Sequence, residues 1–183
     1  MLPLGWVLLA VVVAAALAAW ITFTATRLDR LHARVDAAQA ALDAQLVRRA
    51  AAVALVATVA AADLDPQLTA ALAHGAAAAL AAGPREREPT ENALGRAANQ
   101  LADVSPALSA TYSRDLHEVA EAALRVVIAR RFYNDAVRDT RALRSRRMPR
   151  LLRLAGHREP PQFFDIDDAT RWAPSVPLPG GIP

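Results

Sequence analysis

Two short polar clusters are the parts of this sequence whose residue types could carry chemistry. One surrounds the double arginine Arg48-Arg49 and the other surrounds the double arginine Arg130-Arg131. Guanidinium groups bind carboxylates and phosphates through paired hydrogen bonds, so arginines converging from two helices would form an anion site or a contact for a partner peptide. The candidate contact residues are Arg48, Arg49, Arg130, Arg131, Asn134 and Asp135.

The same residues also fit simpler interpretations. They would form a solvated stripe with a few hydrogen bonds between helices, and Arg131 and Asp135, one helical turn apart, can pair on one face. A catalytic interpretation has little support, because the chain contains no cysteine and no lysine and shows no nucleophile beside a base. The sequence therefore predicts that the protein is not an enzyme.

Signals for cofactors, metals and nucleic acids are equally weak. A phosphate-binding P-loop needs a lysine, and His117 lacks the second histidine of a zinc-binding helix. The acidic residues of the segment 165–168 do not form a calcium-binding loop. Aromatic residues make up only 5% of the chain, too few for base stacking, although the net charge is +3. We therefore expect no cofactor, no metal and no nucleic-acid partner.

The N-terminal segment has the length and composition of a membrane-spanning helix. No charged residue occurs from Leu2 to Phe23, and Trp6 and Trp20 lie near the two ends, where such rings favour the membrane interfaces. About 22 helical residues cover the hydrocarbon core of a bilayer. The alternative is a cleaved signal peptide, because Ala16-Leu17-Ala18 resembles a cleavage site; against it, the apolar run is long and no arginine precedes it.

The arginines beside this span predict its orientation. Arg27, Arg30 and Arg34 follow the span, whereas no basic side chain precedes it. Positive residues mark the cytoplasmic side, so residues 1–25 are expected to be a single pass through the plasma membrane, with the N-terminus outside. Alanines at four-residue spacing in the span would permit a homo-oligomer, although an alanine-rich segment matches that pattern by chance.

Beyond the span, apolar periodicity predicts two long and two short helices. We expect the first long helix over 26–62, directly continuous with the span, and a short helix over 66–82 that the Asp65-Pro66 cap opens. A second short helix is expected over 90–104, and Ser105-Pro106 should cap a second long helix that ends near Arg147. Its apolar stripe, which includes Tyr133, has nearly the spacing of a coiled coil.

These elements predict an all-α fold class. Short connections between amphipathic helices imply an antiparallel four-helix bundle over 26–155. Prolines crowd from Pro160 onward, so residues 156–183 are expected to form an extended or disordered, proline-rich tail.

A basic segment near the end of the last predicted helix is a candidate for contact with the membrane surface. Its arginines alternate with leucines that could enter the lipid interface, and anionic lipids attract each nearby arginine by about 1 kcal/mol. The alternative is that the leucines cap the bundle and the arginines are solvated. The candidate membrane-surface residues are Arg141, Arg144, Arg146, Arg147, Arg150 and Arg153.

Three stretches resemble the LemA family. Residues 34–35 and 42–49 are similar to its "RV … IDVQLKRR" signature, residues 129–137 (ARRFYNDAV) are similar to its "ARRxYNDAV" block, and residues 163–168 (FFDIDD) resemble the ending of actinobacterial members. The chain departs from the family pattern at 53–54, 123–125 and 140–141. The resemblance implies a membrane anchor followed by a cytoplasmic helical bundle, in a family without established catalytic residues.

The sequence thus predicts a membrane-anchored, non-enzymatic interaction or scaffold protein. Its expected partners are the lipid bilayer and another membrane or membrane-associated protein. The alternative is a sensor or enzyme whose anion-binding site is built from the Arg/Asp network of the two long helices.

Overall fold

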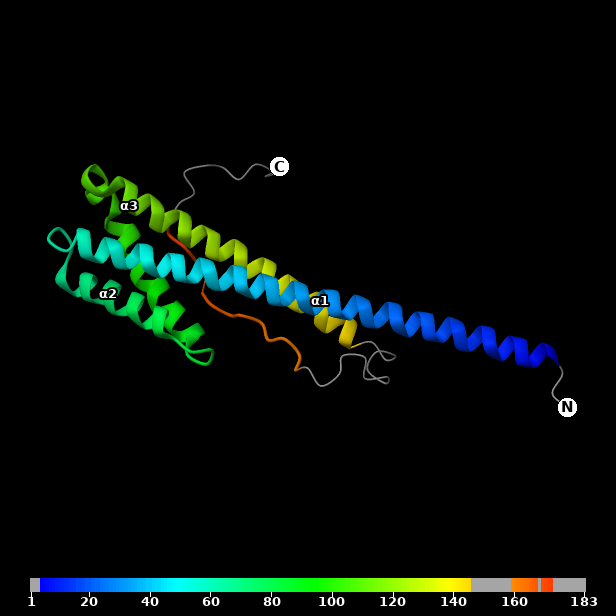
Figure 1. Cartoon of the computed structure of the whole chain (residues 1–183). Coiled ribbons are helices and arrows are strands. Elements are labelled where there is room, and N and C mark those ends of the chain that lie inside the picture. Colours follow the sequence, from blue (N-terminus) through cyan, green and yellow to red (C-terminus); the bar gives the residue numbers. More distant parts are fainter. Residues whose placement is uncertain (1–3, 146–158, 168, 173–183) are drawn as a thin grey trace. The chain divides into compact units, whose positions relative to one another are not determined.

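The computed structural model describes residues 4–145, 159–167 and 169–172. They form three helices, α1 (Leu4–Val59), α2 (Pro66–Ala81) and α3 (Arg87–Arg144) (Figure 1). No strand occurs among these described residues, so the predicted all-α class is confirmed. The apolar N-terminal segment and the first long helix are one continuous helix, as the absence of glycine and proline between them predicts.

The start of α2 is set by local sequence. The Asp65 carboxylate accepts hydrogen bonds from the backbone N–H groups of Gln67 (2.8 Å) and Leu68 (3.2 Å), and Pro66 takes the first helical position. The helix ends at Ala81, and Ala82 is extended before Gly83-Pro84. The predicted cap is therefore confirmed.

The predicted boundary between the third and fourth helices is wrong. The chain stays helical through Pro106. Proline has no N–H group, so Pro106 cannot donate the helical hydrogen bond to the carbonyl of Ala102. The Ser105 hydroxyl donates to that carbonyl instead, at 2.8 Å. The non-helical residue is Tyr112 instead (φ −115°, ψ 24°). We call the parts of α3 before and after it the first arm (87–111) and the second arm (113–144).

The Tyr112 side chain ties this interruption to another turn. Its hydroxyl donates to Asp63 Oδ2 at 2.6 Å, and Asp63 lies in the turn between α1 and α2. The two arms of α3, separated at Tyr112, thus stand where the sequence predicted a third and a fourth helix. The first arm also begins at Arg87, three residues before the start of the helix that the sequence predicts over 90–104.

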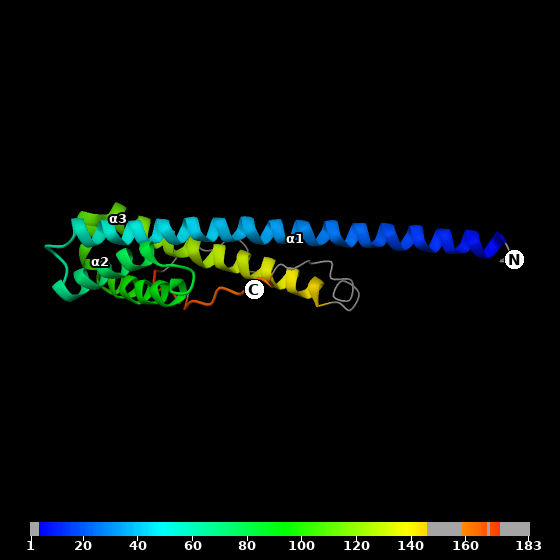
Figure 2. The same ribbon diagram turned by 60° about the horizontal axis from the view of Figure 1, so that its bottom comes forward.

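The chain divides into two compact units. Unit 1 comprises residues 1–38 and 134–163, and unit 2 comprises residues 39–133 and 164–183. In unit 2, one apolar core joins the C-terminal part of α1, α2 and both arms of α3; Figure 2 shows α2 beside that part of α1. Gly75 of α2 packs against Leu94 of the first arm, where an added Cβ would be in ordinary van der Waals contact with Leu94 Cα at 3.5 Å.

Unit 1 packs the rest of α1 against the end of α3. Leu28 and Val35 of α1 are buried, as are Val137 and Leu143 of α3. At its surface, Arg34 and Asp139 form an ion pair at 3.0 Å. Of the predicted tail, residues 159–167 and 169–172 are non-helical, and the remainder lies outside the described residues.

Candidate functional site

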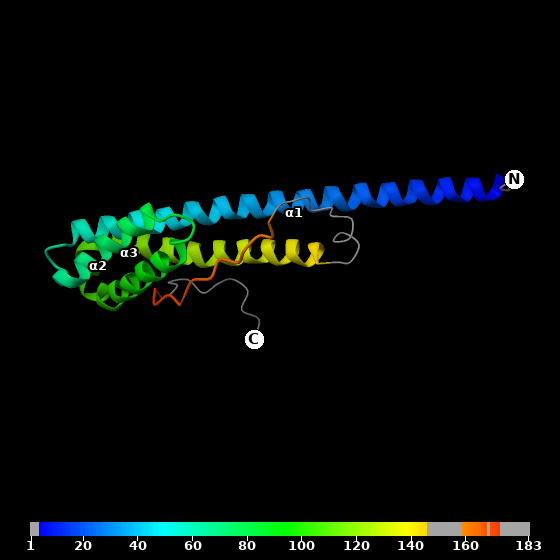
Figure 3. The same cartoon turned by 90° about the horizontal axis from the view of Figure 1, so that it is seen from below.

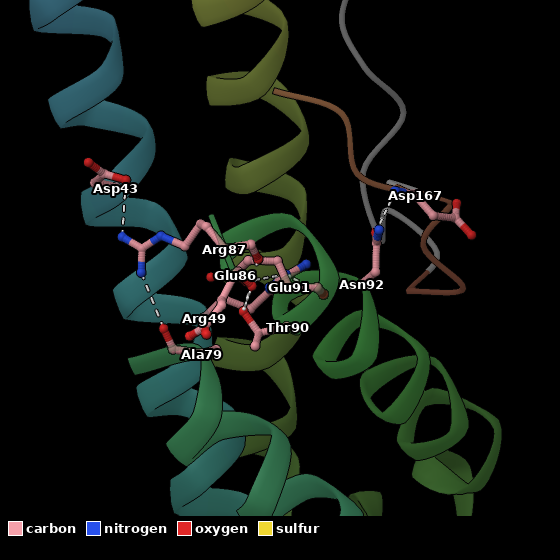
Figure 4. Close-up of polar contacts among 9 residues, drawn as sticks. All are labelled: Asp43, Arg49, Ala79, Glu86, Arg87, Thr90, Glu91, Asn92 and Asp167. Carbon is pink, nitrogen blue, oxygen red and sulfur yellow. Dashed lines mark hydrogen bonds and ion pairs between the residues drawn. The ribbon is translucent and has the colours of Figure 1, made fainter. Parts of the chain in front are cut away.

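A buried ion pair between α1 and α3 is the most unusual polar feature of unit 2. Arg49 Nη2 lies 2.6 Å from Glu91 Oε2 and also donates to the Glu91 backbone carbonyl at 3.2 Å (Figure 4). The side chains of Arg49 and Glu91 are only 6% and 1% exposed. Charged groups are rarely buried so deeply unless they are paired, so this contact links the two helices through the core.

The pair is electrostatically incomplete. Burial raises the pKa of the Glu91 carboxyl above its ordinary value, while the attraction of Arg49 and the hydrogen bond from Arg49 oppose that shift. Arg49 Nε and Glu91 Oε1 have no hydrogen-bond partner among the described residues. The Glu91 charge therefore depends mainly on Arg49, with a smaller favourable contribution from Arg87, and the buried Arg49 guanidinium depends in turn on the Glu91 carboxylate.

Arg87 forms a second connection beside this pair. Its Nη2 lies 3.1 Å from Asp43 Oδ1 of α1, and its Nη1 donates to the Ala79 carbonyl of α2 at 3.2 Å (Figure 4). Ala79 lies in the last turn of α2, where carbonyl groups lack helical partners and a cation is favoured. One side chain of α3 thus contacts both α1 and α2.

An extended segment, which we call the strap (residues 164–167 and 169–172), lies along the first arm of α3 (orange in Figure 3). The N–H of Asp165 donates to Glu88 Oε1 (2.9 Å), and the N–H of Asp167 donates to Asn92 Oδ1 (2.8 Å). Asn99 accepts from the N–H of Arg171 (2.9 Å) and donates to the carbonyl of Ala169 (2.7 Å).

The α3 residues that receive the strap share one helical face. We call this set the α3 stripe, and its three- and four-residue steps are those of neighbours along one side of a helix. Asp103, at its far end, pairs with Arg171. The α3 stripe consists of Glu88, Asn92, Gly95, Asn99 and Asp103.

A small pocket lies between the strap and the helices of unit 2. Its volume is about 20 Å³, and Arg49, Asn99 and Val126 line it from the helices while Thr170 and Trp172 line it from the strap. This is the space of about one water molecule. The pocket therefore has no room for an organic substrate while the strap is in place.

The neighbouring arginines Arg48 and Arg49, which were predicted to share one site, form ion pairs with different glutamates. Arg49 pairs with Glu91 on the first arm of α3, whereas Arg48 is half exposed and contacts Glu118 (3.5 Å) and Glu121 (3.9 Å) on the second arm. On the second arm itself, Arg130 is half-buried and Arg131 is exposed.

Asn134 and Asp135, the other two predicted contact residues, belong to unit 1. Asn134 is half-buried, and Asp135 forms an ion pair with Arg138 at 2.6 Å. Arg48, Arg49 and Asp135 thus each have a separate ion pair, and the six predicted residues are divided between the two units.

Of the candidate membrane-surface residues, two are described. Arg141 stacks on the Phe163 ring at 5.2 Å, and Arg144 Nη1 lies 3.3 Å from both His32 Nε2 and the Glu159 carbonyl oxygen. Arg146, Arg147, Arg150 and Arg153 lie outside the described residues.

The sequence interpretation missed Glu91, the α3 stripe and the strap. Glu91 falls at the start of the helix predicted over 90–104, where an acidic residue is ordinarily explained by the helix dipole. A usable signal was present at the stripe, because polar residues recur there on one helical face beside an apolar one.

No protein-family profile, no curated protein and no solved structure matches the chain. Within the described ranges, no group of three or more histidine, aspartate and glutamate side chains could hold a metal ion. The fold and site thus define a helical protein with a buried ion pair, an internally bound strap and one helix long and apolar enough to cross a membrane.

Proposed function

We propose that this chain is a membrane-anchored interaction or scaffold protein of the LemA type, which presents its helical part at the cytoplasmic face of the plasma membrane. The proposal rests on the exposed apolar surface of the N-terminal part of α1. An 18-residue window there has a mean hydropathy of 2.5, and none of it is buried. A core helix would bury such a surface, whereas a lipid-facing helix has it exposed.

The charge beside this window supports a cytoplasmic placement of the rest of the chain. Arg27, Arg30 and Arg34 lie in the three turns of α1 that follow Phe23, and all three are exposed. Basic residues that follow a span directly are retained on the cytoplasmic side.

The end of α3 supports a second contact with the membrane. Arg144 contacts His32, which lies nine positions after Phe23, or about 14 Å along the helix. A groove of about 410 Å³ in the same unit is lined by Arg27, Arg34 and Leu143. Basic residues next to a span attract anionic lipid headgroups, so we include Arg141, Arg144 and the four arginines after them in this contact.

The arrangement of the polar residues supports a non-enzymatic role. Arg48 and Arg49 are engaged in separate ion pairs, and the pocket beside Arg49 has the volume of about one water molecule. A sensor or enzyme built on converging arginines would need an open, polar cavity for its ligand. In unit 2, four helical stretches around one core favour the antiparallel bundle of the LemA type.

A reporter experiment tests the topology. Alkaline phosphatase fused after Pro183, which is active only outside the cytoplasm, should be inactive, and a fluorescent protein fused at the same position should fluoresce. Replacing Arg27, Arg30 and Arg34 by glutamine should raise the phosphatase activity, because the charge asymmetry is then lost. Strong phosphatase activity of the unmodified fusion would contradict the cytoplasmic placement.

The intact mass of the membrane-extracted protein separates an anchor from a cleaved signal peptide. The anchored chain should have its full mass of 19.5 kDa. A mass that lacks residues 1–18 would show cleavage after Ala18 and would contradict the anchor.

The proposed membrane-surface contact can be measured with liposomes. A fragment that begins at Thr26 should cosediment with anionic liposomes and remain in the supernatant with neutral ones. Moderate salt should weaken the binding, because it screens charges over about 10 Å. Binding should be abolished when four arginines of the basic segment are neutralised, namely Arg146, Arg147, Arg150 and Arg153.

A control variant of equal net charge distinguishes a specific contact from general attraction. This variant should still bind anionic liposomes. It neutralises four exposed arginines of unit 2, namely Arg85, Arg96, Arg114 and Arg125. Equal recovery of the unmodified fragment in the supernatant with both kinds of lipid would refute the contact.

A further inference from the structure

The α3 stripe binds the strap mainly through its backbone. Side chains of Glu88, Asn92 and Asn99 accept hydrogen bonds from the backbone N–H groups of Asp165, Asp167 and Arg171. The N–H of Ala169, between them, donates to Asp167 of the strap itself. Three backbone donors of an extended chain are thus satisfied by side chains of a helix. Contacts of this kind do not depend on which side chains the bound segment carries. The α3 stripe is therefore suited to extended peptides in general.

Three strap side chains add sequence preference. Ile166 is only 4% exposed, and the ring of Trp172 packs against the apolar core of unit 2. The guanidinium of Arg171 pairs with Asp103 at the end of the stripe. A matching segment thus carries an aliphatic residue, and a basic and an aromatic residue five and six positions later.

The strap is a weak and incomplete occupant of this surface. Its hydrogen bonds to the stripe lie at the exposed surface, where each contributes only about 0.5–1.5 kcal/mol. One donor that the helices place in the covered pocket, Arg49 Nε, has no hydrogen-bond partner among the described residues. A ligand that supplies an acceptor there would gain a contact that the strap does not make.

We propose that the α3 stripe and its pocket form a docking site for an extended peptide segment of another polypeptide, and that the strap occupies this site in cis. Like the strap, the segment has an aliphatic anchor, a basic residue for Asp103 and an aromatic anchor. Unlike the strap, it brings a carboxylate or carbonyl oxygen to Arg49 Nε. The strap of a second copy is one such segment. The site deepens the proposed interaction role, but it does not depend on the membrane anchor.

Competition between the strap and an added peptide tests the site. The probe is a fluorescein-labelled synthetic peptide with the sequence of residues 164–172, and its polarisation is measured with the full chain in lipid nanodiscs. The double variant Ile166→Ala/Trp172→Ala, which loses both strap anchors, should bind the peptide at least about tenfold more tightly than the unmodified chain. Further replacement of Asn92 and Asn99 by alanine should abolish that gain, and a peptide of scrambled sequence should not bind.

A second measurement needs no variant. The amide hydrogens of Asp165 and Asp167 should exchange slowly in the unmodified chain, and excess unlabelled peptide should accelerate their exchange by displacing the strap. Equal affinity of the unmodified and double-variant chains, or exchange that the peptide leaves unchanged, would refute the docking site. Membrane flotation of the same samples reports the anchor separately, so a failure of the site is distinguishable from a failure of the proposed function.

Discussion

Glu91→Ala should lower the free energy of unfolding of unit 2 by about 3–5 kcal/mol, because it leaves the Arg49 guanidinium buried without its partner. The two groups lie 2.6 Å apart with almost no exposure to water, so neither can regain its hydration when the other is removed. Urea denaturation of the fragment from Thr26 onward, followed by circular dichroism, measures the change as a shift of the midpoint at constant slope.

The neighbouring arginine provides a matched control. Arg48 belongs to the same turn of α1, but its pair with Glu118 is exposed, so Arg48→Ala should change the free energy of unfolding by less than about 1 kcal/mol. The double variant Arg49→Met/Glu91→Leu should recover most of the lost stability, since two apolar side chains need no compensation for charge. Equal effects of Glu91→Ala and Arg48→Ala would show that the buried pair does not stabilise the fold.

Tyr133→Ala should also destabilise unit 2 strongly, by about 3–5 kcal/mol, the range for deletion of a buried aromatic side chain. The residue is 8% exposed, which confirms its predicted place on the buried face of α3. Burial and the nearby Asp43 and Glu88 carboxylates raise the pKa of the Tyr133 phenol, so the side chain is neutral at physiological pH.

The residue before it is the control for this substitution. Phe132 is 63% exposed, so Phe132→Ala removes an aromatic ring of similar size from the surface and should change the free energy of unfolding by about 0.5 kcal/mol or less. Thermal melting of both variants compares the two faces of one helical turn. Similar melting temperatures would show that this face of α3 is not the packed one.

The apolar N-terminal segment and the start of α2 rest on signals that lie close together along the chain. The apolar window of α1 and its flanking arginines are read within a few dozen residues, and the Asp65-Pro66 cap forms hydrogen bonds two and three residues away. Such features depend on local backbone geometry and on the transfer of side chains from water, which each short segment determines for itself. The sequence alone was therefore sufficient to predict the helical class, the apolar span and the start of α2.

The break in α3 required more than local information. Ser105-Pro106 has the pattern of a helix start, but the Ser105 hydroxyl takes up the carbonyl that proline leaves unpaired, and the helix continues. The interruption at Tyr112 coincides with a hydrogen bond to Asp63, which is 49 positions away. A contact across that separation depends on how the helices pack, so the propensity of neighbouring residues could not locate it.

The candidate site was decided by tertiary structure. Sequence pattern placed Arg48 and Arg49 together, but packing buried Arg49 beside Glu91, 42 positions away, and left Arg48 at the surface. Tertiary packing also placed the strap against the α3 stripe, whose residues lie 68 to 77 positions before their strap partners in the sequence. Local sequence determined which segments are helical and which surfaces are apolar; which polar groups meet was decided only when the helices packed, because their partners are distant in sequence and are selected by burial.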